Sequence, residues 1–159
     1  MKKLLLILLI IFIGCSSNHS AVDLTDYKEY YQAIDNNSFF RDSSSNFAID
    51  FEYTMVEDGT YRYYIIIDNP SFAMYDCAVL IRENGITYEN QDKMMPSSGI
   101  LDTKYSLLPN QVDTANGYPK GIILGGEIED IPFSLDIMIE WWDSSHSSSN
   151  REFLHIESY

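Results

Sequence analysis

Two segments of this chain alternate apolar and polar side chains from one residue to the next, which is the period of a β-strand. Because successive side chains of a strand point to opposite faces, each segment predicts one buried face and one wetter face. In the second of these segments, at residues 133–142, the alternate residues that include Asp136, Glu140 and Trp142 are expected on the wetter, solvated face. The apolar sets are Phe47, Ile49, Phe51, Tyr53 and Met55 in the first segment, and Phe133, Leu135, Ile137, Ile139 and Trp141 in the second.

Further strand-like segments are separated by short turn signals. Asp58-Gly59 and Asn84-Gly85 favour tight hairpins, the second of them leading into a strand at 86–88. Asn116-Gly117 indicates another turn, and Gly125-Gly126 interrupts an apolar segment where we expect a β-bulge. The additional strands are expected at residues 61–67, 75–82, 105–108, 121–128 and 152–156.

One helix is expected before the strands, over residues 23–34. Its apolar residues Leu24, Tyr27, Tyr31 and Ile34 are spaced by three, four and three, which places them on one helix face. Asp23 is the expected N-cap. A helix of about three turns needs a body to pack on, because short isolated helices are marginal in water.

The number and spacing of these strands favour a mostly β fold: an antiparallel β-sandwich, immunoglobulin-like in architecture, with one short N-terminal helix. A β-barrel is the alternative. The segment Leu108-Pro109-Asn110-Gln111, followed by Lys120-Gly121-Ile122-Ile123, resembles a pattern in immunoglobulin-like domains of Gram-positive lipoproteins. In that pattern a proline-centred turn precedes a Lys-Gly strand; the resemblance implies the sandwich fold and assigns no catalytic residue.

The N-terminus has the order of an export signal: Lys2 and Lys3, an apolar run at 4–13, then Gly14 and Cys15. The apolar run is shorter than the roughly 20 residues needed to span a bilayer. Phe12-Ile13-Gly14-Cys15 resembles the lipobox of bacterial lipoprotein signal peptides. The resemblance implies cleavage before Cys15, a diacylglyceryl thioether on its sulfur, and a lipid anchor at the extracytoplasmic face of the cell membrane. An ordinary signal peptide or tail anchor with a chance cysteine is the alternative.

On this interpretation residues 1–14 are a cleaved signal peptide, 15–22 are the lipidated cysteine with a polar tether, and 23–159 form a single domain. The full chain has 10 basic and 24 acidic residues, a formal charge of −14. Loss of Lys2 and Lys3 with the signal makes this −16. Such a chain repels phosphate backbones, so we expect no nucleic-acid partner. It attracts cationic partners such as a basic peptide.

Residue types that carry chemistry are present without a motif around them. Three histidines, His19, His146 and His155, stand outside any nucleophilic-triad or metal-ligand spacing, so no metal or other cofactor is expected. Cys77 is left without a disulfide partner once Cys15 is lipidated, and is expected in the core. Two acid pairs share strand faces, Glu127 with Glu129 and Asp136 with Glu140, and a solvated face explains both. We therefore expect a protein that is not an enzyme.

Outward-facing aromatic side chains are the remaining signal. Trp142 and Tyr64 are the candidate ligand-binding residues, because exposed aromatics are typical of surfaces that bind protein, peptide or carbohydrate. Alternatively the N-terminal helix covers Trp142 through Tyr27 and Tyr31. The leading hypothesis is a non-catalytic binding or scaffolding lipoprotein. The alternatives are an immunity or exclusion lipoprotein that captures a cationic peptide or protein, and a cell-envelope hydrolase that uses carboxylates.

Overall fold

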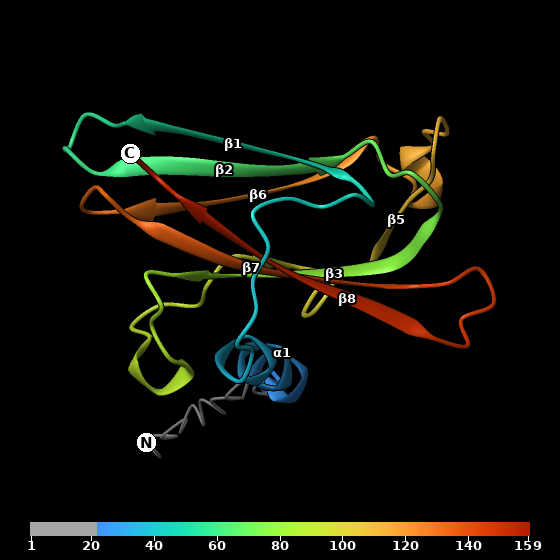
Figure 1. Cartoon of the computed structure of the whole chain (residues 1–159), viewed down its shortest axis with the longest axis horizontal. Coiled ribbons are helices and arrows are strands. Elements are labelled where there is room, and N and C mark those ends of the chain that lie inside the picture. Colours follow the sequence, from blue (N-terminus) through green and yellow to red (C-terminus); the bar gives the residue numbers. More distant parts are fainter. Residues whose placement is uncertain (1–21) are drawn as a thin grey trace, which may run out of the picture.

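The computed structural model describes residues 22–159, so the predicted signal peptide and the predicted lipidation site Cys15 lie outside the described residues. Figure 1 shows three layers: a three-stranded sheet, a five-stranded sheet packed face to face against it, and the helix α1 on the far side of the second sheet. This confirms the predicted antiparallel β-sandwich with one short N-terminal helix. The two sheets are separate, and this rules out the barrel alternative.

The three-stranded sheet has the order β1-β2-β6, formed by β1 (Ala48–Met55), β2 (Tyr61–Asp68) and β6 (Gly121–Ile128). Gly59, with a φ of 90°, makes the predicted tight turn between β1 and β2. The register of β2 with β6 runs without a shift from Tyr61–Ile128 to Asp68–Gly121. The bulge predicted at Gly125-Gly126 is therefore wrong, and the two glycines sit in a regular strand.

The five-stranded sheet has the order β4-β3-β7-β8, with β5 also paired to β3. Its strands are β3 (Met74–Glu83), β4 (Ser97–Ser98), β5 (Tyr105–Leu107), β7 (Ser134–Trp142) and β8 (Ser149–Glu157). The second alternating segment of the sequence is β7, which lies between β3 and β8. The backbone of such a central strand is hydrogen-bonded to a neighbouring strand at both edges. It therefore contacts other layers only through the side chains on its two faces.

The main core fills the space between the sheets. It contains the inward side chains of β2, β3, β6 and β7, including the predicted set of β7 from Phe133 to Trp141. Cys77 is buried in this core, as predicted, and the burial raises the pKa of its thiol to about 12. A thiol held protonated in this way is a poor nucleophile.

The helix α1 (Thr25–Asp35) begins two residues later than expected, with Leu24 at the N-cap. Asp23 instead accepts hydrogen bonds from the backbone and hydroxyl of Thr25, so its predicted N-cap role is wrong. The predicted apolar face is buried, and it forms a second core outside the five-stranded sheet. This second core contains Tyr27, Tyr31, Ile34, Leu80, Met95 and Met138.

Asn84 and Gly85 have φ angles of 50° and 63°, so the predicted tight turn is present. The strand expected after it is absent. Instead the chain leaves the sheet for the short 3-10 helix η1 (Tyr88–Asn90), which packs beside α1. The hydroxyl of Tyr31 donates a hydrogen bond to the carbonyl of Ile86 (2.6 Å), and this contact holds the departing chain against the helix.

Candidate binding site on the three-stranded sheet

The two sheets present their outer faces differently, and this difference locates the candidate site. On the five-stranded sheet Asp136 and Glu140 are only 6% and 9% exposed, so the solvated face predicted for them is wrong. Arg82 lies opposite Asp136 in the register and donates from Nε (3.0 Å), while its Nη1 donates to Asp35 of α1 (2.8 Å). The buried acid is thus neutralised by a strand neighbour that also holds the helix.

Glu140, four residues further along β7, repeats this arrangement. It forms an ion pair with Arg151, its neighbour in the register of β8, and accepts a hydrogen bond from the hydroxyl of Tyr30 on α1 (2.8 Å). His155 lies against Asp136, with 2.7 Å between Nδ1 and Oδ1, and this hydrogen bond raises the pKa of the imidazole. The acids predicted as a surface pair therefore fix α1 to the sheet.

Trp142 lies half-buried at the end of β7, on the same face as Met138. The helix does not cover it in the predicted way. Tyr27 and Tyr31 pack on Leu80 and Met138 in the second core, of which Trp142 is not a member. Trp142 and Tyr64 lie on the outer faces of opposite sheets, so the two candidate residues do not form one site.

The outer face of the three-stranded sheet has no second layer among residues 22–159 (Figure 1). Tyr64 is 38% exposed there and lies across from Gly125, with its ring over the space that a Cβ on this glycine would enter. Beside it, Ile66 faces Ile123, which is 65% exposed. At the outward positions of these strands Arg62 is accompanied by four acidic side chains: Asp50, Glu52, Asp68 and Glu127.

A hollow of about 620 Å³ opens beside Tyr64, where the edge of β6 meets the loop that contains Lys93. The carboxylate of Glu83, only 2% exposed, accepts a hydrogen bond from the hydroxyl of Tyr63 (2.7 Å) and forms an ion pair with Lys93 Nζ (2.8 Å). Burial and the charge of Glu83 raise the pKa of Tyr63, which therefore keeps its proton. The lining residues are Arg62, Tyr64, Glu83, Lys93, Met94, Pro96, Gly125, Gly126 and Glu127.

Gly126 is the reason why Glu83 and Tyr63 can meet. A Cβ on this residue would lie 2.5 Å from the Glu83 carboxylate and 2.6 Å from the Tyr63 hydroxyl. Sequence reasoning missed this cluster. The signal was available in the glycine pair, because a glycine inside a strand marks either a bulge or a close approach. The structure shows the close approach.

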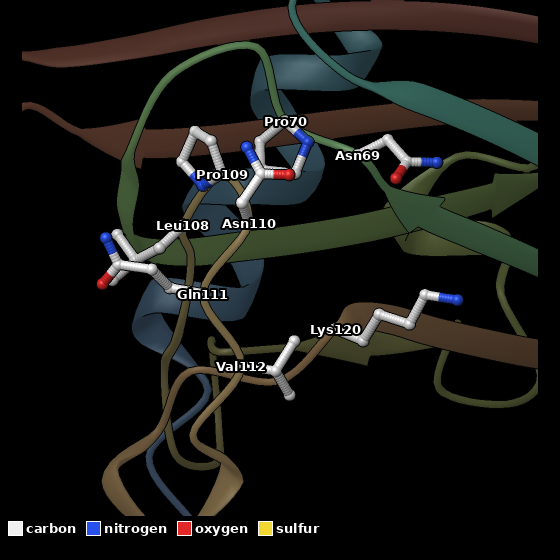
Figure 2. Close-up of a pocket in the computed structure, with 8 residues that line it drawn as sticks. All are labelled: Asn69, Pro70, Leu108, Pro109, Asn110, Gln111, Val112 and Lys120. Atoms are coloured by element: carbon white, nitrogen blue, oxygen red, sulfur yellow. The ribbon is translucent and has the colours of Figure 1, made fainter.

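A second hollow, of about 360 Å³, lies at one end of the sandwich (Figure 2). Part of its wall is the turn from Leu108 to Gln111, closed by the hydrogen bond from the Gln111 amide to the Leu108 carbonyl. Its polar side chains do not converge: Lys120 and Asn69 extend to one side and Gln111 to the other (Figure 2). With no carboxylate among its lining residues, this hollow offers neither an acid pair nor a focused binding point.

No protein-family model, curated protein or solved structure matches this chain. Among residues 22–159, no group of three or more histidine, cysteine or acidic side chains is placed to hold a metal ion. No helix within the same residues is long and apolar enough to cross a membrane. The face around Tyr64 and the N-terminal sequence are therefore the features of this protein that point to a function.

Proposed function

We propose that this protein is a lipid-anchored lipoprotein of the extracytoplasmic face of a bacterial membrane, and that its β-sandwich is a non-catalytic binding or scaffolding module. The observation that carries the binding role is the outer face of the three-stranded sheet, where Tyr64 and Ile123 are exposed and no further layer formed by residues 22–159 covers them. An exposed apolar patch with a polar rim is typical of an interaction surface.

The position of the helix supports this assignment. Thr25, where α1 begins, follows Cys15 by ten residues, a length that spans at most about 35 Å when fully extended. The helix lies on the side of the molecule opposite the three-stranded sheet (Figure 1). A lipid on Cys15 would thus attach the domain from its helix side. The strongly acidic body is repelled by anionic headgroups, which directs the uncovered sheet away from the bilayer.

The state of the carboxylates favours binding over hydrolysis. A carboxylate-dependent hydrolase needs an acid pair that faces its substrate. Asp136 and Glu140, one of the two acid pairs that share a strand face in the sequence, lie beneath α1 and are each paired to an arginine. Glu83 and Glu127 at the larger hollow are likewise paired, with Lys93 and Arg62.

The anchor is tested by metabolic labelling with an alkyne fatty acid in the bacterial host. The wild-type chain is expected to take up the label and Cys15→Ser to lose it. Cys77→Ala is the matched control, because it removes the buried cysteine and should leave labelling intact. Equal labelling of the wild type and Cys15→Ser would contradict the anchor.

The binding face is tested with a photo-crosslinking amino acid placed at position 64 in the anchored protein. We expect a defined adduct from position 64 and none from position 29, since Glu29 is exposed on the outer side of α1. An adduct that forms equally from both positions, or from neither, would contradict a binding face on the three-stranded sheet. The same crosslinker at position 142 tests Trp142 independently.

A further inference from the structure

We propose that the free edge of β6 is a strand-addition site, at which an extended cationic segment of a partner protein pairs as a fourth strand of the three-stranded sheet. This deepens the proposed binding function and rests on it. It specifies the edge that is used, the conformation of the bound segment and the sign of its charge.

The backbone of β6 is available along its outer edge. β6 is the last strand in the order β1-β2-β6 and pairs with β2 over its whole length. Within the described part of the chain, the hydrogen bond made to its outer edge is from Lys93 Nζ to the carbonyl of Glu127 (2.6 Å). Backbone groups point to alternate edges from one residue to the next. Those of Gly125 and Ile123 therefore point the same way as Glu127 and remain open.

Away from its Glu127 end, which the loop with Lys93 contacts, the edge lacks most of the features by which proteins protect exposed strands. Such protection takes the form of bulges, prolines, lysines on the edge, or a covering segment. β8 has a covering segment: the amide of Arg41 donates to the Phe153 carbonyl (3.0 Å), and the amide of His155 donates to the Arg41 carbonyl (2.9 Å). In contrast, β6 is regular, contains no proline or lysine, and exposes Ile123.

Hollows border β6 at both ends and could receive alternate side chains of an added strand. The hollow beside Tyr64 lies at Gly125-Gly126, and one of about 310 Å³ lies at Gly121–Ile123 between β6 and β4. In strand addition, backbone hydrogen bonds provide affinity and such pockets provide specificity.

The opposite edge of the sheet, formed by β1, serves as the internal control in the binding experiments below.

Charge selects the partner. The whole chain has a formal charge of −14. On the outer face, Glu127 of β6 and Asp68 of β2 lie nearest the pairing edge, with Arg62 on β2 and Lys93 at the Glu127 end, whereas Asp50 and Glu52 lie farther away on β1. A second copy of this chain would carry the same net charge and be repelled. A segment with lysine or arginine at alternate positions would bring its cations close to Glu127 and into the field of the acidic chain, with its other side chains over the hollows.

The test uses the full-length chain purified in detergent and an eight-residue peptide of alternating lysine and valine, with binding measured by calorimetry. Two other peptides are compared: the same sequence with its internal backbone nitrogens methylated, and a glutamate–valine peptide. We expect the lysine–valine peptide to bind, and the methylated peptide to bind at least about tenfold more weakly because it cannot pair with a strand. The glutamate–valine peptide should not bind measurably.

Matched variants locate the edge. Ile123 on β6 and Met55 on β1 are both 65% exposed, on opposite edges of one sheet. Ile123→Lys should weaken binding of the lysine–valine peptide about tenfold by adding a like charge at the pairing edge, whereas Met55→Lys should leave it unchanged. Thermal unfolding of both variants checks that they fold.

Each other outcome overturns part or all of the proposal. Equal binding of the methylated peptide would mean attraction by charge without strand pairing, and equal binding of the glutamate–valine peptide would remove the cationic requirement. Equal effects of the two variants would exclude β6 as the edge. If the wild-type chain forms dimers in solution and Ile123→Lys does not, the segment that pairs with β6 belongs to a second copy of this chain and not to a cationic partner. If none of the peptides binds while position 64 still gives a crosslinked adduct, strand addition is wrong and the proposed binding function stands. If the wild-type chain takes up no fatty-acid label, only the lipid anchor is contradicted.

Discussion

The helix α1 lies on the outer face of the five-stranded sheet, whereas the outer face of the three-stranded sheet has no further layer among residues 22–159. Both faces carry acids on strands with the same alternating pattern. Under the helix, Asp136 is 6% exposed and paired with Arg82. On the other sheet, Asp50 is exposed.

This difference shows that the contribution of an outward strand residue to stability depends on whether another layer covers it. Beneath a docked helix, an outward acid needs its own cation, because an unpaired buried charge is very costly. On the three-stranded sheet the same residue type is solvated and needs no cation of its own. We therefore expect substitutions on the two faces to have opposite profiles: large effects on stability under α1, and small ones around Tyr64.

The largest contrast is expected between Asp136→Ala and Asp50→Ala. Removing Asp136 leaves Arg82 with one fewer partner in a buried site, which should lower the free energy of unfolding by about 3–5 kcal/mol. The same change at exposed Asp50 should cost under about 0.5 kcal/mol. Chemical denaturation of both variants measures this. Similar costs at the two positions would contradict the different burial of the two faces.

Apolar outward residues should show the same contrast, slightly reduced. Met138 is fully buried against α1, so Met138→Ala should cost about 2–5 kcal/mol through the cavity that it leaves. Ile123→Ala, on the open face, should cost under about 1 kcal/mol, mainly as lost strand preference. The midpoint of urea unfolding reports both. A costly Ile123→Ala would mean that this residue packs against more than the structure shows.

Gly126→Ala tests the junction between the two sheets. The added methyl group would overlap the Glu83 carboxylate and the Tyr63 hydroxyl, and overpacking of this kind costs about 1–3 kcal/mol. The control is the same substitution in a Glu83→Ala background, where part of the overlap is gone and the additional cost should be smaller. Equal costs in both backgrounds in a double-mutant cycle would show that Gly126 does not serve the Glu83 contact.

The smallest effect concerns pH. The hydrogen bond with Asp136 raises the pKa of His155 in the folded protein. Protonated His155 therefore stabilises the fold fully below the unfolded-state histidine pKa of about 6.5, and this contribution is lost as pH rises through the higher folded-state value. The stability difference between the wild type and His155→Gln should be larger at acidic than at alkaline pH. A difference that grows toward alkaline pH would contradict this sign.

Local patterns predicted most of the elements. Residues 121–128 form β6 as predicted, because an apolar segment rich in isoleucine between turn signals favours one local conformation. Gly59 and Gly117 have the positive φ angles that their turns require. Asn84-Gly85 shows where this reasoning ends: the turn forms, but the next segment packs beside α1 and forms no strand.

The candidate site was predicted only in part. The alternation of β2 placed Tyr64 on an outward face, and it is exposed there. Trp142 was assigned to an outward face by the same rule, but the rule does not indicate which outward face a helix will cover. Glu83, Tyr63 and Lys93 come from separate segments and meet only through the packing of one sheet on the other.

The sequence by itself determined the strand period, the turns, the helix face and the acidic charge, because each depends on residues that are neighbours along the chain. It also carries the motif at Cys15, which lies outside the described residues. Only the tertiary structure decided that α1 docks on Leu80 and Met138, that Asp136 is buried and that β6 is an edge strand of its sheet. These depend on contacts between segments far apart in the chain, and the free energy of such contacts is set by the shape and charge of both surfaces together.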